Sequence, residues 1–255
     1  MDAAAALTVD TMQGTASKTH DPYGRVLRYL HWAIGLFVIF LALTGYAIHF
    51  RDELGFPQLK YVLVYTHAFA SYGFLAVLAV RLILPLVRAV LPRMKDVLPR
   101  QDEVLRLSRQ VEGIRKGKRK TRFAGRSPIS RTVIAVFYAM FFVLMVTGLF
   151  RAGTDLFHPP LGPFVKRYVA ADGLPLSEVK PLDKSTHDKR RARTVMKIKI
   201  PVGKVHVYSG YVVLLIGLVH ILGQLKFEWS LPGQEKRRGF ARIMLFGPKR
   251  ETPDP

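Results

Sequence analysis

The sequence contains no cysteine. This excludes disulfide bonds, iron–sulfur clusters held by thiolates, and covalent haem attachment through a Cys-x-x-Cys-His motif. Acidic residues are also few, with 18 Asp and Glu against 39 Lys and Arg, for a net charge of +21. The first 24 residues contain three acids and no apolar run, so they lack the features of a cleavable signal peptide. We therefore expect the first membrane span to act as an uncleaved insertion signal.

Hydrophobic residues make up 49% of the chain and gather in four blocks that are separated by basic connections. A soluble protein would spread these residues at the period of a helix or strand, whereas blocks of about 20 apolar residues are typical of membrane-spanning helices. The predicted spans are residues 29–50, 61–87, 132–150 and 205–225. The sequence thus predicts an all-α integral membrane protein, a four-helix transmembrane bundle with short interfacial helices.

The four spans fall in one domain, residues 25–246, between a flexible cytoplasmic tail at residues 1–24 and a short C-terminal tail at residues 247–255. The connection at residues 88–131 carries 14 Lys and Arg and a run of apolar residues at helical spacing, which predicts a short amphipathic helix on the membrane surface. The connection at residues 151–204 carries twelve bases and six prolines, and we expect an extended or partner-ordered loop there.

The distribution of basic residues predicts the orientation of the spans. If both termini are cytoplasmic, the inner segments contain 24 Lys and Arg and the outer segments contain 14. Basic residues are enriched on the cytoplasmic side of membrane proteins and interact with anionic lipid there. We therefore expect a multi-pass protein of the bacterial inner membrane with cytoplasmic termini, and no nucleic-acid partner.

Two histidines, His206 and His220, lie fourteen residues apart on the fourth span. At helical rise and twist they share one face and are separated by about 21 Å along the axis. Gly210 and Gly217 lie on the same face and leave space beside it. This is the arrangement that two flat cofactors stacked along one helix would require.

Depth in the membrane predicts which histidines can pair. His67 and His206 lie near the outer starts of their spans, whereas His31 and His220 lie near the inner side. A histidine with a free ring nitrogen is a standard axial ligand of haem iron. The depths predict an outer site from His67 and His206 and an inner site from His31 and His220. Interfacial histidines that bind water or backbone remain the alternative.

Other basic side chains lie where they could contribute to these two sites. His49 could replace His67 or support a third site, but its polar neighbours favour an interfacial position. Arg81 lies fourteen residues after His67, so it either binds a haem propionate at the inner level or extends to the inner interface. Arg28 invites the same proposal, or a role in orientation only. The remaining histidines, at positions 20, 158 and 187, are expected to be solvated.

The residues also resemble those of a known family. Four features carry the resemblance: Arg28 and His31 in the stretch RYLHW, Thr-Gly pairs late in spans one and three, an early histidine in span two, and the paired histidines of span four. They resemble the bacterial di-haem cytochromes b, the four-helix subunits of respiratory formate dehydrogenases and nickel–iron hydrogenases and their relatives. The resemblance implies the same histidine pairing, two b haems, and quinone chemistry beside one haem. The long basic and proline-rich connections depart from the pattern, so the partner stays open.

We therefore interpret the chain as an electron conduit between the quinone pool and a periplasmic redox partner, either a c-type cytochrome or a catalytic subunit. It would act within a hetero-oligomeric respiratory or photosynthetic complex, and any enzymatic role would be quinone oxidoreduction. A histidine-containing transporter or metal carrier is one alternative, but it should place acidic ligands in the membrane, and the four spans contain no Asp or Glu. A structural membrane anchor is another.

Overall fold

A computed structural model describes most of the chain, namely residues 24–87, 108, 112–113, 116, 128–181, 183–229 and 244. The two predicted tails, and most of the segment expected to form an amphipathic surface helix, lie outside the described residues. The chain divides into two compact units, residues 30–223 and residues 1–29 with 224–255. Residues 30–223 contain all four candidate haem ligands.

The described part of the chain contains four long helices: α2 (Gly24–His49), α3 (Lys60–Val87), α6 (Pro128–Leu156) and α8 (Lys189–Trp229). Each is long and apolar enough to cross a membrane. A spanning helix satisfies its backbone hydrogen bonds internally, which lipid requires. Large apolar side chains such as Leu43, Phe69 and Leu215 are exposed on the outside of the helices, as expected where lipid is the solvent. The prediction of an all-α membrane bundle is confirmed.

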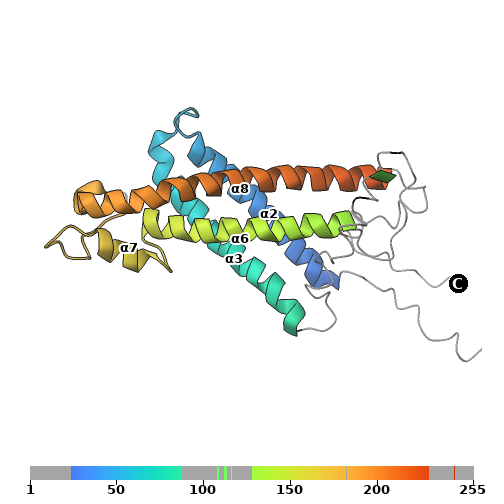
Figure 1. Ribbon diagram of the computed structural model, residues 1–255, viewed down its shortest axis with the longest axis horizontal. Coiled ribbons are helices and arrows are strands. Elements are labelled where there is room, and N and C mark those ends of the chain that lie inside the picture. Colours follow the sequence, from blue (N-terminus) through green and yellow to red (C-terminus); the bar gives the residue numbers. More distant parts are fainter. Residues whose placement is uncertain are drawn as a thin grey trace, which may run out of the picture. The chain divides into compact units, whose positions relative to one another are not determined.

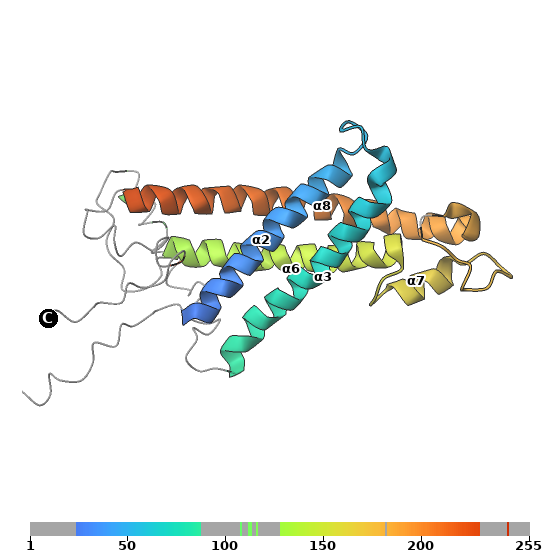
Figure 2. The same ribbon diagram turned by 180° about the vertical axis from the view of Figure 1, so that it is seen from behind.

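The four helices form two antiparallel pairs (Figures 1 and 2). A tight link joins α2 to α3, in which Gly55 adopts a φ of +76° that side-chain-bearing residues rarely adopt. The short 3-10 helix η1 (Pro57–Leu59) leads into α3. In both views α6 and α8 run side by side. The first pair contacts the second where α3 packs against α6.

The core of residues 30–223 lies at mid-depth. Its buried side chains come from α3, α6 and α8, and they are Phe74, Leu78, Phe141 and Val213. The rings of Phe74 and Phe141 meet edge to face, with centroids 5.2 Å apart. Val213 lies midway in sequence between His206 and His220. This apolar layer therefore separates the levels of the two α8 histidines.

The connection between α6 and α8 differs from the expected extended loop at residues 151–204. α6 continues to Leu156 and α8 begins at Lys189, so only residues 157–188 join them. With 41 residues, α8 is about 60 Å long, roughly twice the thickness of the hydrocarbon core, so it extends beyond the bilayer. Pro201 lies inside this helix, although proline removes a backbone hydrogen bond and usually ends a helix. The sequence signal that placed residues 189–204 in a loop was therefore misleading.

The shorter connection is itself folded. It contains helix α7 (Gly162–Val169) and the 3-10 helix η2 (Lys184–Thr186). An isolated antiparallel bridge joins Ala170 to His187. Val179 is almost fully buried, at 1% exposure. The segment thus has a small core of its own and is not an extended loop.

Candidate functional site

Two predicted ligands, His67 of α3 and His206 of α8, come together in the structure. Their ring centroids are 6.3 Å apart and the ring planes are nearly perpendicular, at 78°. Both side chains are half-buried. The two imidazoles are therefore direct neighbours in space, although more than half of the sequence separates them.

A threonine from a neighbouring helix fixes each of these rings. Thr44 Oγ1 lies 2.9 Å from Nδ1 of His67, and Thr147 Oγ1 lies 2.9 Å from Nδ1 of His206. Each hydroxyl also donates to a backbone carbonyl one turn earlier, on Phe40 at 2.9 Å and on Val143 at 2.6 Å. A hydroxyl has one proton to donate, so it accepts the hydrogen bond from the histidine N–H. This places the proton on Nδ1 and leaves Nε2 free to bind a metal.

A glycine follows each threonine and leaves room for the ring. A Cβ built on Gly45 would lie 3.4 Å from Cε1 of His67, and one built on Gly148 would lie 3.3 Å from Cε1 of His206. A larger side chain at either position would press on the imidazole. The Thr-Gly pairs of α2 and α6 thus support the histidines of α3 and α8 in the same way, so the outer site has an internal two-fold pattern.

The spacing of the outer pair fits two ligands on one metal ion. Zinc–imidazole bonds are about 2.0–2.1 Å and a ring nitrogen lies about 1.1 Å from its ring centre, so two rings opposed across a metal are about 6.3 Å apart. The centroids of His67 and His206 match this value. Among the described residues no group of three or more His, Asp or Glu could hold a metal ion. Haem iron needs only two axial ligands from the protein.

The inner candidates are His31 of α2 and His220 of α8. His31 lies close enough to His220 and to Arg81 for both to affect it electrostatically. The ring of His31 contacts Trp32 at 6.1 Å, and the ring of His220 meets Phe137 edge to face at 6.2 Å. The structure therefore brings the second predicted pair into one region.

Arg81 of α3 carries an unsatisfied charge beside the inner histidines. Its Nη1 atom is buried and has no hydrogen-bond partner. A buried guanidinium nitrogen without a partner is costly, and a carboxylate is the ligand that best satisfies it. Because Arg81 also acts on His31, the residues present fit a haem whose propionate reaches this arginine.

Comparison with known proteins identifies the family. Residues 22–233 match the family described as prokaryotic cytochrome b561. The chain belongs to the prokaryotic cytochrome b561 family. Searches of curated proteins and of solved structures gave no match. A cytochrome b561 is a membrane protein that binds haem b, generally through histidines, and transfers electrons, and members generally interact with quinones and redox partners.

The other basic residues of this cytochrome b561 take varied positions. His49 is exposed and its ring packs edge-on against Phe50, at 4.7 Å. Arg28 precedes His31 by three residues on α2. His158 and His187, which were expected to be solvated, are both partly exposed. The ring of His158 lies 5.6 Å from that of Tyr65, and the ring of His187 lies 5.7 Å from that of Phe157. His20 lies outside the described residues.

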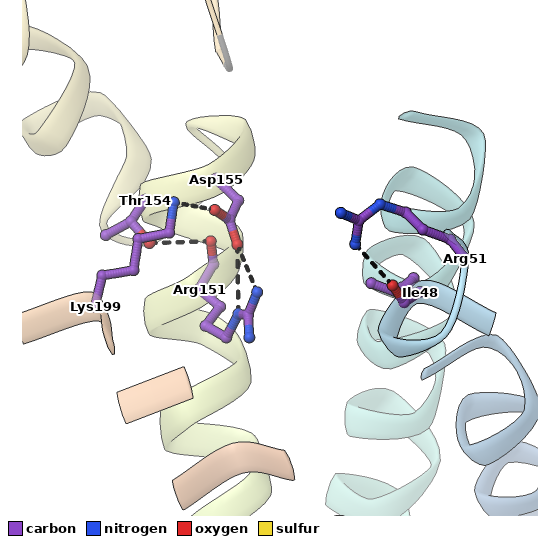
Figure 3. A network of polar contacts seen from close by, with 6 residues as sticks. All are labelled: Ile48, Arg51, Arg151, Thr154, Asp155 and Lys199. Carbon is purple, nitrogen blue, oxygen red and sulfur yellow. Dashed lines mark hydrogen bonds and ion pairs between the residues drawn. The ribbon is translucent and has the colours of Figure 1, made fainter. Parts of the chain in front are cut away.

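Sequence reasoning missed a polar cluster just beyond the outer histidines (Figure 3). Arg151 of α6 donates from Nε and Nη2 to Oδ2 of Asp155, at 3.4 and 3.3 Å. The other carboxylate oxygen forms an ion pair with Lys199 of α8. The signal available in the sequence was the position of Arg151, one turn after a Thr-Gly pair. Its placement in an assumed loop concealed this relation.

Proposed function

We propose that this chain is a di-haem b cytochrome that carries electrons across the bilayer between the quinone pool and a periplasmic redox partner. It would do so as a subunit of a respiratory or photosynthetic complex in the bacterial inner membrane, with both termini cytoplasmic. His67 and His206 are the proposed axial ligands of the outer haem, and His31 and His220 those of the inner haem. Bound haem supplies the one-electron chemistry.

The observation that carries this proposal is the outer histidine pair and its threonine supports. The 6.3 Å between the ring centroids matches that of two imidazoles bound to one metal ion, and the hydrogen bonds at both Nδ1 atoms leave both Nε2 atoms available as ligands. His220 lies fourteen residues further along α8, about 21 Å deeper. A second haem at that depth would let an electron cross the membrane in two steps, whereas a single haem at the outer level would not reach the inner side.

The proposed inner site relies on charge as well as on ligands. Arg81 would bind a propionate of the inner haem through the nitrogen that otherwise lacks a partner. Arg28 is a second candidate for such a contact, from the first turns of α2. Quinone chemistry beside one of the haems would connect the conduit to the quinone pool. These roles follow the residue pattern that the family resemblance implies.

The folded connection of residues 157–188 and the start of α8 form the proposed partner surface. The first sixteen residues of α8 carry seven Lys and Arg and no acid, and in the proposed orientation they face the periplasm. A basic surface of this kind would attract an acidic redox partner and speed its association. A c-type cytochrome or a catalytic subunit with an acidic docking face fits this chemistry.

Transmembrane electron transfer can be measured directly in liposomes. The purified protein is reconstituted into vesicles that contain trapped ferricyanide, and dithionite is added outside with an ionophore that dissipates the charge. One electron leaves dithionite for each ferricyanide that is reduced inside, and neither reagent crosses the lipid. We expect reduction in vesicles with the intact protein, and only the leak rate in those with His220→Ala or His206→Ala. Equal rates in all vesicles would refute the conduit.

A further inference from the structure

Arg151 is held firmly beside the proposed outer haem site. Asp155, which is buried, binds its Nε and Nη2 atoms. On the opposite side Nη1 lies against the bare backbone of Gly203, where an added Cβ would come within 3.2 Å of it. Arg151 follows Thr147 by one helical turn, and Gly203 precedes His206 by one turn. The guanidinium is therefore fixed between α6 and α8, one turn outward from the histidine pair.

The cluster carries a net positive charge. Arg151 and Lys199 contribute two positive charges and Asp155 one negative charge. The charge of Arg151 acts on both His67 and His206. Because only 35% of its side chain is exposed, Arg151 stabilises an anion more effectively than an arginine in open water would. The site is thus suited to a carboxylate at the edge of the histidine pair.

A second arginine lies in the link that follows α2. Arg51 donates from Nη1 to the carbonyl of Ile48 at 3.0 Å and pairs with Asp52 at 3.0 Å. In Figure 3 the guanidinium groups of Arg51 and Arg151 are directed toward each other from the two helix pairs. Two guanidinium groups on opposite sides of one space can each bind one of two carboxylates, and the fork of an arginine suits this geometry.

We propose that Arg151, with Arg51 opposite, binds the propionates of the outer haem. This inference rests on the proposed function, because it requires a haem at His67 and His206. Asp155 and Lys199 are then positioning residues that set the direction of the Arg151 guanidinium. The positive cluster also favours the reduced haem, which carries one more negative charge than the oxidised haem.

The test separates a direct contact from a general effect of charge. Outer-haem affinity is measured for the intact protein and for Arg151→Gln, first with ordinary haem b and then with haem whose two propionates are methyl esters. We expect Arg151→Gln to weaken ordinary haem by about ten- to a hundredfold, the size of one charge-assisted hydrogen bond. The loss should be much smaller with the ester. Lys204→Gln is the matched control, because it also removes one positive charge. Lys204 is exposed and follows Gly203, the residue of α8 that contacts Arg151.

Redox titration gives an independent readout. Arg151→Gln should shift the outer-haem potential downward by about 59 mV if the ratio of reduced to oxidised haem changes tenfold. Arg151→Lys, which keeps the charge, should restore most of this shift. An equal loss of affinity for haem and its ester, or no loss for either, overturns the proposal. If Arg151→Gln does not fold, the same affinity and redox measurements are made on Arg51→Gln and judged by the same criteria. An intact protein without an outer haem would instead refute the proposed function.

Discussion

The threonine supports give the sharpest prediction for the outer site. Thr147→Val keeps the shape of the side chain but removes the hydroxyl that accepts the Nδ1–H of His206. The imidazole then has a half-buried N–H without a partner, and the ring is free to rotate. Since the hydrogen bond also makes Nε2 a better donor to the metal, we expect weaker haem binding and a higher midpoint potential.

Two independent estimates of the loss agree. Leaving a buried donor unsatisfied costs about 1–3 kcal/mol. Substitutions that remove the hydrogen-bond partner of a metal ligand typically lower affinity by about 10–100-fold, which equals about 1.4–2.8 kcal/mol. Thr44→Val removes the matching hydrogen bond to His67 and should have the same effect. Both variants act on one haem, so neither should change the inner site.

The assay is transfer of haem to an excess of a competing apoprotein, followed by the absorbance of each haem, together with a redox titration. Thr147→Ser should restore both affinity and potential, because it returns the hydroxyl. Thr66→Val is the control, because Thr66 is exposed and adjacent to His67 in sequence. If Thr147→Val retains the outer haem with unchanged affinity and potential, the assigned role of the threonine is incorrect.

Four further substitutions test the outer site and the polar cluster beside it. His206→Ala should remove the outer haem and His49→Ala should remove none, as judged by haem per chain; haem loss with His49→Ala would overturn the assignment. Gly148→Val should expel the outer haem, because even an added Cβ lies 3.3 Å from the ring of His206; normal haem content would show that the ring can move aside. Asp155→Asn should lower stability by about 3 kcal/mol, since it unpairs two cations from a carboxylate that is 11% exposed. Thermal unfolding tests this loss, with Asp172→Asn in the exposed pair with Arg191 as a control that should cost under about 1 kcal/mol.

The fold and the proximity of His67 to His206 could be predicted from the sequence, because both depend on regular helical geometry. Apolar blocks of spanning length predict helices directly, and residue number along a helix gives depth. This logic matched His67 with His206, and the structure brings these two rings to 6.3 Å. It also grouped His31 with His220 and Arg81, which the structure brings into one region.

Features that depend on tertiary contacts were not accessible. The sequence marks Thr44 and Thr147 only as members of Thr-Gly pairs, and their hydrogen bonds to the histidines depend on how the helices pack. The length of α8 was not predicted, because Pro201 was counted with the prolines of the expected loop. In the structure Pro201 lies inside the helix. The role of Arg151 was not predicted because the third span was expected to end at residue 150, which placed Arg151 in the loop. In the structure Arg151 lies on α6, one turn after Thr147.

The central claim is that one chain holds two b haems, and counting them tests it most directly. The purified protein is quantified by its polypeptide content and by the pyridine haemochrome of its haem, alongside a dithionite-reduced minus oxidised spectrum. The account predicts two haems b per chain, falling to one with His206→Ala and to one with His220→Ala. A single haem in the intact chain, or no loss of haem in either variant, would contradict it.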